Sequence, residues 1–551
     1  MQRRLVNAPA AEMGARGRPD DVTRQNAKGF SMKLLRFLAS AALMLPLLTG
    51  VAHSQANDPT KTLVIAVPAD AAGLEPGVNK AEPIGSEVIL NVFDTLVAWT
   101  APEFSKLEGR LAESWTVSDD GTTFDFKLRS GVKFHDGTDF DANAVKFSIE
   151  RTKAANSYVQ ATFGLISDIA VVSPTEVKIT LSKPYPAFLS ILAQPQSAIV
   201  SPAAVEKLGD QFASHPVGTG PFKFVSHQDD TNIVLEANPD YFRGAPKISR
   251  IVYRIIPDAS TRRLELENGG VDIVQQQGQL AAIAAQDLEA LKSNPAISIL
   301  EAPSQIIRQL EFNNSSTTSP VANLKVRQAI AHAIDYDGLL QGVFAGTAER
   351  VYGPLTSNSW AFNPKMKEMA PKYDPAEAKR LLAEAGVDPA SLNFKLYSFQ
   401  GSLWGAVATF VQANLADIGI NATIEQTEFP AYRALQTAGQ FDIALDGRQP
   451  WYNDPDAHIT IGYLSSLADT AMTFRMPKDD PLDQLILKAQ QTADQEARKQ
   501  LYFQIQEEIM NRVPGAYLFS PKLIVFERAN VKGLVVNSAP PLNEYWSVYK
   551  E

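Results

Sequence analysis

The sequence predicts a mixed α/β protein built around more than one hydrophobic core. Its 551 residues exceed the roughly 250–300 residues at which a single core stops growing, so we expect two large lobes or three domains. Patterns typical of strands and of helices alternate irregularly along the whole chain. This alternation favours mixed lobes over a helical bundle or a β-sandwich.

Four short segments before residue 400 have the pattern of strands. Residues 63–67 form an apolar run that ends at Pro68, as expected of a buried strand. In residues 123–129, apolar and polar side chains alternate, so Phe124 and Phe126 would share one buried face. The other two segments are residues 177–181 and 394–397.

Five segments carry apolar residues at the spacing of a helix, and some have clear start and stop signals. Asp141 is placed to cap the helix that follows it. Asp374 and Pro375 supply a cap and a first helical residue to another helix. Gly386 and Gly419 would each end a helix. The five segments are residues 86–97, 141–149, 324–333, 374–386 and 407–418.

Residues 32–56 have the three parts of a secretory signal peptide. A basic segment at 32–36 precedes an apolar run at 37–48, and small residues at 52–54 and 54–56 offer cleavage sites. The apolar run is shorter than the roughly 20 residues that a membrane span needs. We therefore expect an exported protein whose mature chain begins near residue 57.

Residues 1–31 lie upstream of this signal and are Arg-rich and polar. They are either an extended leader or the product of a start assigned too early, with translation beginning at Met32. The chain contains no cysteine, so no lipid can be attached after the apolar run. The sequence therefore predicts a periplasmic protein and not a lipoprotein.

The charge balance excludes a nucleic-acid binder. Residues 1–56 hold 8 basic and 3 acidic residues, and the remaining chain holds 43 basic and 58 acidic residues, a formal net charge of −15. Phosphate contacts need clustered Lys and Arg, which an acidic chain of this kind does not provide.

The sequence shows no catalytic, metal or cofactor motif. A secreted hydrolase, the distant alternative, needs an activated nucleophile or a metal-bound water. The six histidines show no HExxH spacing, and no serine stands in a GxSxG elbow. We therefore predict no catalytic residues, no metal site, no cofactor and no enzyme activity.

Several blocks in consecutive order resemble the peptide/nickel/opine (family 5) solute-binding proteins of ABC importers. The signature block spans residues 111–149 and contains Leu128-Arg129-Ser130-Gly131-Val132-Lys133-Phe134-His135-Asp136-Gly137. The later blocks are residues 217–222, 238–242, 326–335 and 374–386. Most of these residues have a structural interpretation: Asp136-Gly137 closes a turn, His135 belongs to that turn and is not a ligand, and Gly218 and Gly220 allow backbone geometry that a side chain would block.

The resemblance implies an α/β, two-lobed periplasmic-binding-protein fold with an extra inserted subdomain, three domains in all. The lobe I core would comprise residues 57–95, 216–304 and 523–551, with residues 96–215 as the inserted subdomain. Lobe II would comprise residues 305–522. Ligand would be enclosed by hinge closure between the lobes.

The resemblance also places the ligand-facing residues in the second lobe, after the strand pattern at 441–445. Peptide-binding members carry an acid a few positions before the Asp454-Pro455 pair, and this carboxylate binds the peptide's ammonium. Trp451 stands at that position here, which leaves Asp446 or Asp454 as substitutes. Dipeptide-binding relatives also place an arginine in the loop that corresponds to residues 398–404, and this loop has none.

Other residues offer an alternative ligand site. Arg448 could clamp a carboxylate through its planar fork, and aromatic side chains could form flat apolar walls. The predicted ligand-binding residues are Trp404, Asp446, Arg448, Trp451, Tyr452, Asn453 and Asp454. For the aromatic residues the competing interpretation is core packing, and for Arg448 it is a structural ion pair.

The sequence therefore predicts a monomeric periplasmic solute-binding protein that serves an inner-membrane ABC permease and ATPase complex. Because both peptide anchors are missing, an opine-like molecule, a modified amino acid or a sugar conjugate is the preferred ligand. The alternative is a di- or oligopeptide. Nickel or haem uptake, or a role as a chaperone or sensor partner, stays open.

Overall fold

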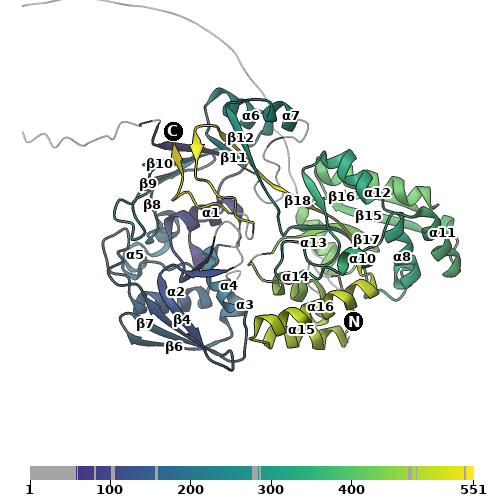
Figure 1. The fold of residues 1–551 in the computed structure, drawn as a ribbon, viewed down its shortest axis with the longest axis horizontal. Coiled ribbons are helices and arrows are strands. Elements are labelled where there is room, and N and C mark those ends of the chain that lie inside the picture. The colour runs from purple at the N-terminus through teal and green to yellow at the C-terminus, as the bar shows by residue number, and fades with distance from the viewer. Residues whose placement is uncertain are drawn as a thin grey trace, which may run out of the picture. The chain divides into compact units, whose positions relative to one another are not determined.

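Three main β-sheets of seven, six and four strands organise the chain in a computed structural model (Figure 1). The structure describes residues 58, 60–79, 82–100, 106–155, 159–275, 283, 287–450, 452–468, 474–478, 481–538 and 542–551. The predicted signal peptide at 32–56 and residues 1–31 lie outside the described residues. Among the described helices, none has the length and hydropathy of a membrane span.

The seven-stranded sheet combines strands from the beginning, the middle and the end of the described chain. Its order is β12 (Ile297–Ala302), β19 (Leu523–Arg528), β11 (Ile273–Gln275), β1 (Thr62–Val67), β10 (Arg250–Ile255), β9 (Asn232–Ala237) and β8 (Phe222–Gln228). β1 runs parallel to both β10 and β11. Helix α1 (Pro83–Val92) contributes Val88 and Ile89 to the same apolar core as Ile65 and Ile251.

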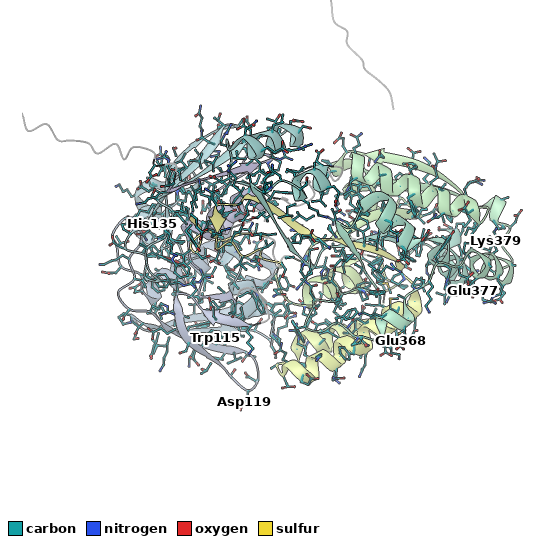
Figure 2. All side chains as sticks on the ribbon, turned by 45° about the horizontal axis from the view of Figure 1, so that its top comes forward. Trp115, Asp119, His135, Glu368, Glu377 and Lys379 are labelled. Atoms are coloured by element: carbon teal, nitrogen blue, oxygen red, sulfur yellow. The ribbon has the colours of Figure 1, made fainter. Side chains whose placement is uncertain are left out.

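The four-stranded sheet is antiparallel throughout. Its order is β4 (Ala112–Val117), β5 (Thr123–Leu128), β7 (Glu176–Leu181) and β6 (Ile166–Ser173). The alternation predicted for β5 is confirmed, because Phe124, Phe126 and Leu128 are buried. They pack in one core with Val145 and Ile149 of α2 (Ala142–Ala154). Trp115 on β4 and Asp119 in the turn after it are labelled in Figure 2.

The six-stranded sheet is mixed. Its order is β14 (Ala348–Arg350), β18 (Gly515–Pro521), β13 (Ile307–Phe312), β17 (Ile443–Arg448), β15 (Asn393–Phe399) and β16 (Asn421–Thr427). β15 runs parallel to β16 and β17, whereas β13 runs antiparallel to β17 and β18. Helices α8 (Leu324–Ala333), α11 (Pro375–Glu384) and α12 (Ser402–Asp417) lie beside these strands (Figure 1). The apolar faces of these three helices pack into the hydrophobic core of the six-stranded sheet.

The remaining elements connect or cover these sheets. The longer helices are α6 (Ala259–Asn268), α13 (Phe429–Thr437), α14 (Asp456–Tyr463), α15 (Pro481–Gln491) and α16 (Gln495–Arg512). The shorter helices are α3 (Gln160–Phe163), α4 (Phe188–Leu192), α5 (Pro202–Leu208), α7 (Leu288–Lys292), α9 (Tyr336–Leu339) and α10 (Met366–Met369). Two strand pairs are β2 (Val97–Trp99) with β3 (Leu107–Gly109) and β20 (Val531–Lys532) with β21 (Tyr549–Lys550).

The predicted helix caps are confirmed. The Asp141 side chain accepts a hydrogen bond from the Ala144 amide at 3.0 Å, and Asp374 accepts one from the Glu377 amide at 2.9 Å. Gly419 has a φ of +88°, as a glycine that ends a helix requires.

Helix α2, predicted at 141–149, continues to Ala154. Two other predicted helices also have different bounds in the structure. The helix predicted at 86–97 begins at Pro83 and ends at Val92, since Phe93 is extended and the Val92 carbonyl accepts from the Gly220 amide at 2.9 Å. The helix predicted at 407–418 begins earlier, at Ser402. In both cases the apolar spacing identified the helix, but contacts distant in the sequence set its ends.

The fold class is that of a mixed α/β protein with several sheets, as predicted. The seven-stranded sheet draws its strands from 62–67, 222–302 and 523–528, the four-stranded sheet from 112–181, and the six-stranded sheet from 307–521. The exact domain boundaries stay a prediction.

Candidate functional site

The predicted ligand-binding residues that the structure describes lie on or after two neighbouring strands of the six-stranded sheet, β15 and β17. The parallel strands β15 and β17 end at Phe399 and Arg448, and their following segments leave the sheet on the same side. Ligands of open α/β sheets bind outside the carboxyl ends of such strands. Trp404 follows β15 and Tyr452, Asn453 and Asp454 follow β17, whereas Trp451 lies outside the described residues.

Asp446 on β17 is the centre of a buried polar network. Its carboxylate accepts from Arg433 Nη1 at 2.7 Å and Nη2 at 3.2 Å, and from Gln436 Nε2 at 2.7 Å. The Gly447 amide donates to the same carboxylate at 2.7 Å. Because these four donors occupy its oxygens, the carboxylate is held inside the protein and positions α13 against the sheet.

Arg448, two residues further along β17, pairs with a second buried acid. Its Nη2 lies 3.0 Å from Glu311 Oε1 on β13, and its guanidinium lies 4.6 Å from the centre of the Phe474 ring. Burial and the nearby Asp446 raise the pKa of Glu311 to about 7, against the effect of Arg448. The clamp predicted from sequence is therefore engaged in a structural ion pair.

Asp454 is also paired, with an arginine of α16. Its two carboxylate oxygens each accept from Arg498 at 2.7 Å, in a bidentate pair between two buried side chains. Burial raises the pKa of Asp454 even though Arg498 opposes that shift. This ion pair fixes the segment that joins β17 to α14.

Tyr452 and Asn453 join this segment to other parts of the chain. Tyr452 belongs to the apolar core of the four-stranded sheet, and its hydroxyl donates to Asp456 at 2.8 Å. The Tyr185 hydroxyl donates to the same Asp456 oxygen at 2.7 Å. Asn453 accepts from Gln305 Nε2 at 2.9 Å. The competing interpretation of core packing thus fits Tyr452.

Trp404 lies in the first turn of α12 and is 6% exposed. Its ring meets the Phe399 ring edge-on, with centroids 5.3 Å apart. The Arg308 guanidinium of β13 lies 5.6 Å from the centre of the Trp404 ring. Trp404 is therefore a buried aromatic residue that packs beside a buried cation.

Arg308 on β13 is a buried charged residue of this region that is not among the predicted ligand-binding residues. The strand segment Ile306-Ile307-Arg308-Gln309-Leu310-Glu311-Phe312 is buried throughout. Charged residues inside a buried strand are rare unless they are paired, so this segment did carry a signal. The structure thus brings Trp404, Asp446 and Arg448 around β13 and β17, and holds Tyr452, Asn453 and Asp454 in a second network around α14.

One cavity of the described residues lies away from the predicted ligand-binding residues. It has a volume of about 470 Å³ and is lined by Arg350, Tyr352, Lys372, Met510 and Tyr517 among others. None of the predicted ligand residues lines it. This cavity lies beside β14 and β18 and is separate from the predicted ligand-binding residues.

One group among the described residues has the composition of a metal site. Asp70, His227 and Asp229 each offer a ligand atom within 4.8 Å of the others. However, Asp70 already accepts from His227 Nε2 at 2.8 Å and from the backbone amides of Ala71 and Asp230. This arrangement is that of a carboxylate that orders a turn.

Comparisons with known proteins agree with one another. Residues 106–467 match the family model described as bacterial extracellular solute-binding proteins, family 5 Middle. The probable D,D-dipeptide-binding periplasmic protein DdpA of Escherichia coli (strain K12) is 30% identical over 516 residues, which is 92% of this chain and 97% of DdpA. The glutathione-binding protein GsiB of Escherichia coli O1:K1 / APEC is 33% identical over 446 residues, 78% of this chain and 83% of GsiB.

A solved structure shows the same fold. The periplasmic binding protein DppA of Helicobacter pylori, in complex with the peptide STSA, has a TM-score of 0.75 and 28% identity. The alignment covers 89% of this chain and 98% of that one. The match extends across all three sheets, so the two-lobed fold of that family applies to the chain described here.

Proposed function

Because this chain belongs to the family 5 bacterial extracellular solute-binding proteins, we propose that it is the periplasmic binding component of an ABC importer and that its ligand is a small peptide. The family consists of binding proteins and not of enzymes. The observation that carries the ligand class is the similarity, over 92% and 78% of this chain, to relatives named for a D,D-dipeptide and for glutathione.

The opine-like ligand preferred from sequence is not confirmed, and the peptide alternative fits the relatives better. The preference rested on two missing anchors in loops. It assumed that a ligand's charged ends are held only from those two loops, whereas buried charges on β13 and β17 lie at the same edge of the sheet.

The predicted residues have different parts in this proposal. Trp404 and Trp451 would form walls of the ligand site. Asp446, Arg448 and Asp454 would shape it through their ion pairs with Arg433, Glu311 and Arg498. Tyr452 and Asn453 would join the inserted subdomain to lobe II when the lobes close on ligand. We further propose that the protein acts as a monomer with an inner-membrane permease and ATPase complex.

A ligand screen tests the proposal. Thermal unfolding of the purified protein would be followed with dipeptides, glutathione, oligopeptides, opines, oligosaccharides and nickel with and without histidine. A ligand that binds only the folded state stabilises it by about 2.7 kcal/mol at a hundredfold excess over Kd. We expect a dipeptide or glutathione to raise the melting temperature of the native protein, and we expect no such rise in Trp404→Ala. A rise with opines alone would contradict the peptide ligand and restore the opine-like one.

A further inference from the structure

We infer that Arg308 is the anchor for a free carboxylate of the ligand, a site formed by β13, the glycine of β17 and the first turn of α12. This inference rests on the proposed function, because it names the chemical group by which a small peptide would be recognised. It adds a residue outside the loops in which sequence reasoning placed the anchors.

The Arg308 side chain packs against the backbone of a glycine on the neighbouring strand. Arg308 is opposite Gly447 in the antiparallel pairing of β13 and β17. A Cβ atom at position 447 would lie 2.1 Å from Arg308 Nη1 and 2.7 Å from Cδ. Only glycine at 447 therefore lets the arginine lie across the neighbouring strand.

The charges around Arg308 do not balance. Among the described residues, Arg433 pairs with Asp446, and Arg448 pairs with Glu311. Arg308 is 2% exposed, and its Nη1 has no hydrogen-bond partner among the described residues. Two buried carboxylates thus serve three guanidinium groups, of which those of Arg308 and Arg448 are buried and that of Arg433 is partly buried. One guanidinium group is left without an anionic partner among the described residues.

Neither carboxylate can be shared easily with Arg308. The oxygens of Asp446 accept from Arg433, Gln436 and the Gly447 amide. Those of Glu311 accept from Gln309, Gln436 and Arg448. Burial lowers the pKa of Arg308 to about 10, which leaves the group charged at neutral pH. A buried charge without a partner is costly, so its presence here indicates a partner that arrives from outside.

The first turn of α12 carries Trp404, whose ring lies beside the Arg308 guanidinium. Arg308 lies 5.6 Å from the ring of Trp404, the third residue of this 16-residue helix. The residue at its N-cap is Gly401, and no side chain caps the helix. Unpaired amides at a helix N-terminus attract anions, and a guanidinium binds carboxylate through two parallel hydrogen bonds. Each of these features favours a carboxylate over a neutral group.

The decisive test uses acetate as the smallest carboxylate probe. Thermal unfolding would be measured in acetate and in chloride at equal ionic strength, for the native protein, Arg308→Met and Arg308→Lys. The matched control is Arg327→Met, since Arg327 is another guanidinium of the same lobe. Its partners are four backbone carbonyls, those of Val321, Ala322, Arg512 and Val513. We expect acetate to raise the melting temperature of the native protein and of Arg327→Met, but not that of Arg308→Met.

The unliganded proteins give a second readout. Arg308→Met removes an unbalanced charge, so it should keep or raise the melting temperature, whereas Arg327→Met should lower it. Arg308→Lys keeps the charge and should keep part of the acetate response. An acetate response that survives in Arg308→Met, or a loss of stability equal to that of Arg327→Met, would overturn the inference.

A peptide arm separates this inference from the proposed function. Alanyl-alanine and its C-terminal amide would be compared by calorimetry. We expect the native protein to prefer the acid by at least about 30-fold, and Arg308→Met to reduce this preference to about 3-fold or less. An Arg308-dependent acetate response without peptide binding would support the anchor and contradict the peptide ligand. Peptide binding with an unchanged acid preference in Arg308→Met would support the peptide ligand and contradict the role of Arg308 as its anchor.

Discussion

His458 shows how burial fixes the protonation state of a single residue. The ring lies on α14, is 2% exposed, and its Nε2 is 2.9 Å from the Gln305 carbonyl oxygen. A carbonyl only accepts, so Nε2 carries the proton. Burial, with the nearby Arg448, lowers the pKa of His458 to about 3. The folded protein therefore holds this histidine neutral across the whole physiological range.

We predict that this histidine makes the free energy of unfolding depend on pH. In the unfolded chain the ring titrates near pH 6.5, so below that pH only the unfolded state gains a proton, and stability is lost as the pH falls. His458→Gln should be less stable than the native protein at pH 7.5. The gap should shrink by about 1.4 kcal/mol for each pH unit between about 6 and 4. Urea unfolding across that range measures it, and a gap that stays constant would contradict the assignment.

The sequence allowed some of these residues to be predicted, but not their partners. Asp446, Arg448 and Asp454 were predicted to follow a strand at 441–445, and all three are buried. The strand is Ile443–Arg448, so Asp446 and Arg448 lie within it and only Asp454 follows it. Their partners Arg433, Glu311 and Arg498 lie on three different elements. Which arginine meets which acid depends on how those elements pack, and a single sequence does not contain that information.

At the scale of elements, a close backbone approach joins the loop before β8 to the end of α1. A Cβ atom at Gly218 would lie 2.3 Å from the Val92 carbonyl oxygen and 2.8 Å from the Phe93 Cα. The Gly220 amide donates to the same carbonyl at 2.9 Å. The glycines of this sequence block are therefore required by proximity, because their φ angles are not positive.

We predict that Gly218→Ala lowers the free energy of unfolding by about 2–4 kcal/mol, because backbone atoms cannot yield as a flexible side chain does. The midpoint of urea unfolding would measure the loss. Gly73→Ala is the matched control, since a Cβ there meets nothing within 4 Å. That variant should change stability by about 0.5 kcal/mol or less. Equal effects of the two substitutions would show that proximity to α1 is not the reason for glycine.

Elements with strong local signals were predicted well and those fixed by distant contacts were not. The capped helices α2 and α11 begin where their aspartates predict. Helix α1 ends five residues before the end of its apolar pattern, because Leu96 and Val97 join a strand pairing with residues 109–112. Periodicity alone cannot separate a buried helix from a buried strand that continues the same apolar run.

At the scale of the whole molecule, Asp456 connects the four-stranded sheet to the segment that follows β17. Its carboxylate accepts a hydrogen bond from the hydroxyl of Tyr185, which precedes α4 and lies 271 residues away in the chain. It accepts another from the hydroxyl of Tyr452, 4 residues away. All three side chains are buried. If the lobes close on ligand as proposed, this cluster is formed in the closed state and holds it together.

We predict that Tyr185→Phe speeds ligand dissociation. Losing a buried hydrogen bond to a carboxylate costs about 1.5–3 kcal/mol, which corresponds to a roughly 10- to 100-fold faster off-rate if the bond exists only in the closed state. Tyr463→Phe removes the hydrogen bond between Tyr463 and Tyr517, both in the six-stranded part of the chain, and serves as the control. The off-rate of the ligand identified in the screen would be measured by stopped-flow for the native protein and both variants. An equal off-rate in both variants would contradict a role in closure.

The order of strands in the two large sheets has a consequence for synthesis. β18 lies between β13 and β14, and β19, which follows it directly, lies between β11 and β12. When residues 515–528 emerge from the ribosome, the other strands of both sheets have already been synthesised. Neither sheet is continuous without β18 and β19, because these strands lie between others. Pairings so distant in the sequence form slowly. Both sheets therefore stay incomplete in the nascent chain until residues 515–528 have been made.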